Sequence, residues 1–128
     1  MQDKKNFYID GEWVSPIESR ILQVINPATE EPCAEISLGG KKDVDVAVEA
    51  AKKAFETWGF VSKEEKLVFF EKLYEIYKKN WDQMAKTISL EMGAPIDFST
   101  ELQTKTGASH IKSFKNILKE FKFERTLD

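Results

Sequence analysis

The sequence has only one cysteine and one histidine among its 128 residues, and both scarcities exclude whole classes of protein. A single thiol cannot close an internal disulfide bond, so the chain is not a disulfide-stapled secreted scaffold, and we expect a reducing, cytoplasmic setting. One cysteine with one histidine also falls short of the ligand count of a structural zinc site. A metal centre built from these two residue types is therefore excluded.

Strong net charge and long apolar runs are missing as well. Nineteen basic and twenty-two acidic side chains leave a formal net charge of -3, which provides no excess of positive charge to hold nucleic-acid phosphates. No run of about 18 apolar residues occurs, and the first residues lack the apolar core of a signal peptide. With 41% apolar and 32% charged residues, the sequence predicts a folded globular chain without a nucleic-acid or membrane partner.

The first 40 residues have the pattern of two short β-hairpins. Apolar residues at 7–9 and 13–14 flank Asp10-Gly11, a dipeptide that favours a tight turn because it tolerates positive φ. Apolar runs at 21–25 and 33–38 flank a proline-containing segment, residues 26–32, which predicts a turn. Two such hairpins do not make an independently stable sheet, so we expect them to pack against something else.

After residue 40 the apolar residues recur every three or four positions, which predicts helices. Ser62 and Glu65 form a capping-box pattern that starts the second helix. The fourth would be about 40 Å long at about 1.5 Å per residue, too long for a compact globule of this size, so we expect a larger fold around it. The predicted class is α+β, with two short N-terminal hairpins followed by about four helices near residues 41–58, 63–80, 81–92 and 96–121.

Residue chemistry alone indicates no catalytic constellation. Cys33 lies in an alternating strand near Glu31 and Glu35, and neighbouring carboxylates disfavour the thiolate that a nucleophile needs. His110 lies in the middle of the predicted fourth helix, where a surface or packing role is the commoner one. Gly39-Gly40 joins a strand to a helix but lacks the third glycine of a dinucleotide-binding turn. Carboxylates at the predicted helix starts are expected to stabilise the helix dipole.

Four segments occur in an order and spacing that point to one family. They read FYIDGEW at 7–13, INPATEE at 25–31, DVDVAVEAAKKAFETW at 43–58 and LEMGAP at 90–95. Together they resemble the N-terminal region of NAD(P)-dependent aldehyde dehydrogenases, with Ala94 standing where that family commonly has lysine. The resemblance implies that residues 1–128 are an incomplete N-terminal part of the coenzyme-binding domain of the α/β aldehyde dehydrogenase fold, without its Rossmann core and catalytic domain.

The resemblance also implies an activity for the full-length protein, the oxidation of an aldehyde to a carboxylic acid with NAD or NADP. In that family the nucleotide-binding core, the nucleophilic cysteine and the general base come later in a longer chain. The resemblance therefore implies no catalytic and no cofactor-binding residue in these 128 residues, which we expect to be inactive alone. The implied partners are the remainder of the chain and, in the full enzyme, further copies in a homo-oligomer.

Two sites follow from the same resemblance. Thr106 and His110 match positions that approach the mouth of the substrate tunnel, although packing against neighbouring helices is an open alternative. The main-chain carbonyls of Val24 and Ile25 and the carboxylate of Glu91 match a site for K+ or Na+, the alternative being a Glu91 bonded to water or a lysine. Hard cations prefer such oxygen ligands, and a cation would offset a carboxylate placed against its own helix dipole.

A second interpretation of the sequence remains open. The chain could be a free-standing, truncated helical interaction module that binds a partner through uncovered apolar faces and has no enzymatic activity. A small enzyme of another type is a third interpretation, which no group of residues supports.

Overall fold

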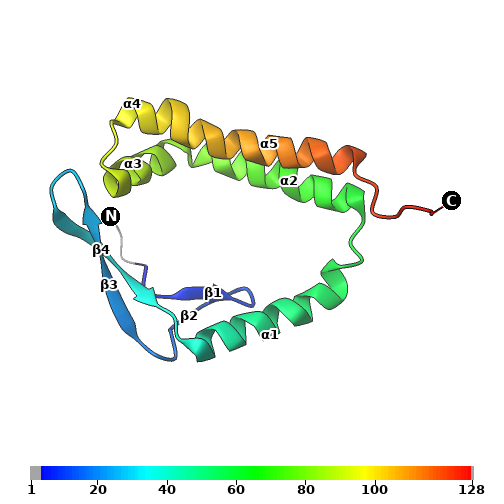
Figure 1. The fold of residues 1–128 in the computed structure, drawn as a ribbon, viewed down its shortest axis with the longest axis horizontal. Coiled ribbons are helices and arrows are strands. Elements are labelled where there is room, and N and C mark those ends of the chain that lie inside the picture. Colours follow the sequence, from blue (N-terminus) through cyan, green and yellow to red (C-terminus); the bar gives the residue numbers. More distant parts are fainter. Residues whose placement is uncertain (1–3, 128) are drawn as a thin grey trace. The chain divides into compact units, whose positions relative to one another are not determined.

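A computed structural model describes residues 4–127, which divide into two compact units. The first unit comprises the residues up to Phe60 together with Ser89–Ala94, and the second comprises Val61–Ile88 and the residues from Pro95 onward. Along the chain, two hairpins come first and the helices follow (Figure 1). The predicted α+β class is therefore confirmed.

The first hairpin of the first unit follows the sequence prediction closely. Strand β1 (Phe7–Ile9) pairs antiparallel with β2 (Glu12–Val14). The two residues between them, Asp10 and Gly11, both have positive φ, 52° and 85°. This is the backbone conformation that a two-residue hairpin turn needs, and it explains why the aspartate-glycine pair stands there.

The second hairpin has longer strands and a shorter turn than predicted. Strand β3 (Arg20–Asn26) pairs antiparallel with β4 (Glu31–Leu38). The predicted turn at 26–32 is too long, because the Glu30 N–H already donates to the Asn26 carbonyl at 2.8 Å and closes the turn. Glu30 adopts a φ of 60°, which lets the chain reverse within these few residues.

Pro32 lies inside β4 and not in the turn, and a β-bulge accommodates it. Val24 is opposite Ala34, but the next residue, Ile25, is opposite Pro32, so Cys33 is the additional residue on β4. Proline cannot donate to a strand ladder, and a bulge is one of the few places where a sheet tolerates it.

The segment before β1 adds hydrogen bonds to the free edge of β4. The Lys4 N–H donates to the Glu35 carbonyl at 3.0 Å, and the Ser37 hydroxyl donates to the Lys5 carbonyl at 2.7 Å. Ser37 and Ala34 are buried at this position. Strand β4 therefore has a backbone neighbour on both sides within the first unit.

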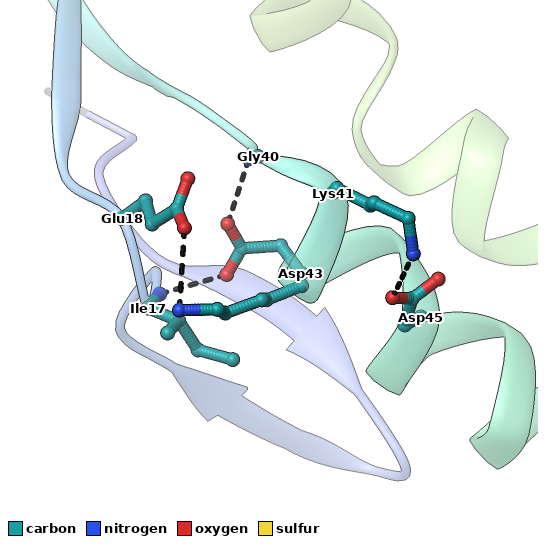
Figure 2. Close-up of polar contacts among 7 residues, drawn as sticks. Ile17, Glu18, Gly40, Lys41, Asp43 and Asp45 are labelled. Atoms are coloured by element: carbon teal, nitrogen blue, oxygen red, sulfur yellow. Dashed lines mark hydrogen bonds and ion pairs between the residues drawn. The ribbon is translucent and has the colours of Figure 1, made fainter.

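Helix α1 (Lys41–Trp58) has the predicted bounds, and Asp43 in its first turn ties it to the loop before β3. One carboxylate oxygen accepts the Ile17 N–H at 2.7 Å, and the other accepts the Gly40 N–H at 2.8 Å (Figure 2). The side chain is buried, with 6% of its residue surface exposed. These bonds hold the pKa of Asp43 below its ordinary value, and the bond from Ile17 has a larger effect than that from Gly40.

The second unit is built around helices α2 (Lys63–Lys79) and α5 (Lys105–Glu120), which lie side by side (Figure 1). The predicted capping box is present, since the Ser62 hydroxyl accepts the Glu65 N–H and the Glu65 carboxylate accepts the Ser62 N–H. Helix α3 (Trp81–Met92) begins in this unit and ends in the first. The residues buried most completely in the second unit are small: Ala85, Ser99, Thr104 and Ala108.

The predicted single helix at 96–121 is wrong in one respect. A short α4 (Ile96–Phe98) leads into a π-helical turn, η1 (Ser99–Thr104), before α5 begins. The Thr104 hydroxyl donates to the Ser99 carbonyl five residues earlier, at 2.8 Å, and this side-chain bond matches the wider π spacing. The apolar periodicity did not reveal the change, because one wide turn shifts the pattern by a single residue.

We predict that Asp43→Asn lowers the melting temperature of the full-length protein. An amide oxygen can accept one of the two backbone N–H bonds, but the amide nitrogen cannot accept the other. Because the folded-state pKa is depressed, the stabilisation is complete above the unfolded-state pKa of about 3.9 and is lost as the pH falls through the folded value. The difference in melting temperature between wild type and variant should therefore shrink as the pH is lowered below about 4.

Asp45→Asn is the matched control for this prediction. Asp45 lies in the same helix turn but is exposed, and it contacts only the exposed Lys41 ammonium, at 2.7 Å (Figure 2). Surface pairs of this kind contribute little to stability. Equal melting temperatures for the two variants at pH 7 would contradict the role given to Asp43.

Candidate functional site

The three residues of the candidate cation site all belong to the first unit. Val24 is half-buried in β3, Ile25 is exposed, and Glu91 is exposed in the last turn of α3. The loop after α3 packs on the turn after β3, because Gly93 lies against Pro27 and its neighbour. The structure therefore brings the loop that follows Glu91 against the turn that follows Ile25.

Gly93 makes that contact possible in two ways. Its φ is 66°, in the left-handed region that favours glycine, and a Cβ there would lie 3.0 Å from the Pro27 Cγ and 3.3 Å from the Ala28 nitrogen. The Ser89 hydroxyl donates to the Ala94 carbonyl at 2.6 Å and closes the loop around Glu91. The position of the Glu91 main chain thus depends on a glycine and a serine that flank it.

The β-bulge interrupts the strand ladder at this place. Pro32 is opposite Ile25 and has no N–H, so it cannot complete the strand ladder at that pair. The Asn26 side chain accepts the Ala28 N–H at 2.9 Å and fixes the start of the turn. The donor set consists of oxygen atoms alone, which suits a hard cation. Residues 4–127 contain no group of three or more His, Cys, Asp or Glu side chains that could hold a metal ion.

The two candidate tunnel residues lie in the second unit. Thr106 and His110 are both exposed and stand one helical turn apart on α5. The Thr106 hydroxyl donates to the Leu102 carbonyl at 2.8 Å, so its hydrogen is already used and the oxygen can only accept from a ligand. The structure brings these two residues onto one helical face.

Sequence reasoning missed a group of residues around the π turn. The Tyr77 hydroxyl on α2 donates to the Thr104 carbonyl at 3.0 Å, and burial raises the pKa of that hydroxyl, which keeps it protonated. Ser99 is fully buried, and its hydroxyl has no hydrogen-bond partner among the described residues. The one signal in the sequence was the pair Ser99 and Thr104, two small hydroxyl residues spaced by five in an otherwise helical pattern.

The described residues form no nucleophile-base pair. Cys33 is half-buried at the bulge in β4, and no hydrogen bond of its thiol is present among the described residues. Asp43 is the buried carboxylate, and both of its oxygens already accept backbone N–H groups. A hollow of about 390 Å³ lies beside Asp43. No basic side chain lines it, so it does not suit the phosphates of a dinucleotide. Its lining residues are Ile9, Asp10, Glu12, Val14, Ser15, Ile17, Asp43 and Val46.

Comparison with known proteins agrees with this picture. The sequence model of the aldehyde dehydrogenase family matches residues 13–127. The solved aldehyde dehydrogenase of Bartonella henselae is 53% identical, with a TM-score of 0.95 over 100% of this chain and 27% of its own. Aldehyde dehydrogenase C of Pseudomonas syringae, solved as a variant with NAD+ and octanal, is 35% identical, with a TM-score of 0.92 over 97% of this chain and 26% of its own.

A curated relative gives the same result from sequence. The 3-succinoylsemialdehyde-pyridine dehydrogenase of a Pseudomonas species is 41% identical over 99% of this chain and 27% of its own length. The fold and the matched sequence are those of a part of an aldehyde dehydrogenase. The chain belongs to the aldehyde dehydrogenase family.

The chain spans about a quarter of the length of the relatives that it matches. The resemblance found in the sequence is therefore confirmed, both for the family and for the place of the chain as a part of a larger fold. Within residues 4–127, no helix is both long and apolar enough to cross a lipid bilayer.

We predict that Gly93→Ala destabilises the first unit by about 1–3 kcal/mol, the range for a side chain forced into the left-handed region. The added Cβ also meets the Pro27 ring at 3.0 Å. Gly39→Ala is the control, because φ at Gly39 is not positive and its Cβ would meet the Phe7 ring at 3.4 Å and the Asp43 Cβ at 3.6 Å, which are ordinary contact distances. Urea unfolding of the full-length protein measures both. Equal midpoints for the two variants would contradict the account of Gly93.

Proposed function

We propose that the full-length protein that carries this chain oxidises an aldehyde to the carboxylic acid, with NAD or NADP as hydride acceptor. The observation that carries the proposal is the match along nearly the whole chain to enzymes of this family, at up to 53% identity in a closely similar fold. The relative from Pseudomonas syringae was solved with NAD+ and an aldehyde, which supports NAD as the cofactor to test first.

In this proposal the 128 residues supply scaffold and no reacting group. They form the N-terminal part of the coenzyme-binding domain, and the remainder of the chain supplies the nucleotide-binding turn, the nucleophile and the general base. The bound cofactor would take the hydride from the substrate. The proposed partners are the remainder of the chain and further copies in a homo-oligomer. No observation favours the alternative of a free-standing interaction module.

The test is aldehyde oxidation by the full-length protein, followed as NADH absorbance with octanal and with a second, aromatic aldehyde. We expect turnover with at least one of them. The chain of residues 1–128 alone is the control and should neither oxidise aldehydes nor bind NAD+ in calorimetric titration. Full-length protein with Cys33→Ser should keep the wild-type rate, since no activating cation is assigned to that thiol. Absence of aldehyde oxidation by the wild type would contradict the proposal.

Within this function we assign Thr106 and His110 to the mouth of the substrate tunnel. Their exposure on one face of α5 supports the assignment. The Thr106 oxygen, whose hydrogen is donated to Leu102, offers the substrate an acceptor and a methyl group but no donor. At Thr106 itself, such a side chain suits an apolar part of the aldehyde, and a hydrogen-bond donor at this mouth would come from the His110 ring.

We further propose that the carbonyls of Val24 and Ile25 and the Glu91 carboxylate hold K+ or Na+. Three features support it: the oxygen-only donor set, the proline opposite Ile25 in the ladder, and the packing of the Gly93 loop on the turn after β3. Three protein oxygens leave room for water or for groups from the remainder of the chain. The cation would act on stability and not on the chemistry at the nucleophile.

We predict that Glu91→Gln weakens the stabilisation of the full-length protein by K+ or Na+. Because an ion that binds only the folded state raises its stability with concentration, wild type should melt higher as K+ replaces a bulky organic cation at fixed ionic strength. The variant should show a smaller rise and an unchanged kcat. Glu56→Gln, at an exposed position of α1 in the same unit, is the control. Equal melting shifts for Glu91→Gln and wild type would exclude the site.

A further inference from the structure

The π turn η1 is held from outside by one hydroxyl group. Tyr77 reaches across from α2, and its hydroxyl donates to the main-chain carbonyl of Thr104 at 3.0 Å. Thr104 is the last residue of η1 and directly precedes α5. This bond therefore acts at the point where the helix returns from π to α geometry.

The close approach of Tyr77 requires a glycine on the facing helix. A Cβ built at Gly107 would overlap the Tyr77 hydroxyl, and it would lie 3.0 Å from the ring carbon that carries the hydroxyl. Gly107 is in the first turn of α5, where glycine weakens a helix relative to alanine by about 1 kcal/mol. Gly107 thus lowers the intrinsic stability of α5 but leaves the space that the Tyr77 hydroxyl occupies.

A second set of bonds fixes the same turn from within. Thr104 is fully buried, and its hydroxyl donates to the carbonyl of Ser99, also fully buried, at 2.8 Å. The Ser99 hydroxyl lacks a partner among the described residues, although a buried polar group without one is costly. The π turn therefore persists although the unpartnered Ser99 hydroxyl costs free energy. Wide turns of this type occur often at functional sites.

The junction sets the rotation of the residues that follow it. One residue more or less per turn rotates a helix face by about 100°, so the geometry at Thr104 decides which way the next two turns face. Thr106 follows the junction by two residues, and its hydroxyl reaches back to the carbonyl of Leu102 inside η1. His110 follows one turn later on the same face.

We propose that Tyr77 is a positioning residue for the aldehyde: its hydroxyl fixes the π-to-α junction at Thr104 and thereby the direction in which Thr106 and His110 face. The proposal rests on the proposed function, because it needs an aldehyde that passes these two residues. Tyr77 contacts no substrate in it and acts only through the junction.

The test compares Tyr77→Phe with wild type in the full-length enzyme. We expect KM for the aldehyde to rise about threefold to tenfold, the range that corresponds to the loss of one hydrogen bond, with kcat and the KM for NAD+ unchanged. Hydrogen exchange of the amides at residues 100–108 should become faster. In a Thr106→Ala background, Tyr77→Phe should have a smaller effect on the aldehyde KM, because Tyr77 acts on the substrate partly through Thr106.

Tyr74→Phe is the matched control. Tyr74 lies about one turn earlier on α2, its ring stays in place beside the Lys112 ammonium, and the structure shows no hydrogen bond of its hydroxyl. This variant should behave as wild type in the aldehyde KM, in kcat, in the KM for NAD+ and in hydrogen exchange. If Tyr77→Phe does not fold, Gly107→Ala perturbs the junction from the other side and should raise the aldehyde KM in the same way.

An unchanged aldehyde KM in a folded Tyr77→Phe or Gly107→Ala enzyme overturns the proposal, even if the melting temperature falls, since a purely structural hydroxyl would give that result. A KM rise that Tyr74→Phe reproduces overturns it as well. A wild-type protein that oxidises no aldehyde overturns the proposed function itself, and the two failures are therefore distinguishable.

Discussion

Hydrogen bonds to the backbone, and not a core of large side chains, hold each unit of the described chain together. The residues buried to more than nine-tenths are small or polar: Ala34, Ser37, Asp43, Ala85, Ser99, Thr104 and Ala108. Large apolar residues stay in contact with solvent, as Phe55 at 68% and Phe114 at 62% exposure illustrate. Burial of apolar surface is the main driving force of folding, and within these units it comes from half-buried residues such as Leu67 and Phe70 and not from a fully buried core.

This constraint explains why the polar contacts are so informative. Asp43 joins α1 to the loop before β3 through the Ile17 N–H and caps its own helix through the Gly40 N–H, and Tyr77 joins α2 to the end of η1 through the Thr104 carbonyl. Each replaces, at one point, the packing that a larger core would provide. The exposed apolar faces also support the proposal that the remainder of a longer chain covers them, as the fourfold greater length of the relatives would allow.

Much of the fold could be predicted from the sequence because local rules decide it. Asp10 and Gly11 take the positive φ that their identity favours, helix α1 has the bounds that its apolar periodicity indicates, and Ser62 caps α2 with Glu65. The bulge at Cys33 and the π turn escaped prediction. Both insert one residue into a regular element, and a single-residue insertion changes an apolar pattern too little to detect.

The candidate sites were predictable only as far as the family resemblance reached. It indicated Val24, Ile25, Glu91, Thr106 and His110, but not the residues that fix their main chain. Those are Gly93, which lies against Pro27, and Tyr77, which reaches Thr104 over Gly107. None of these contacts leaves a periodic signal, since each joins a glycine or a carbonyl to a residue distant in sequence. In both places a missing Cβ lets two segments approach, and the candidate ligand or lining residue stands within three residues of the contact point. Main-chain geometry at Gly93 and at the π turn is therefore what either site would need before any side chain could bind.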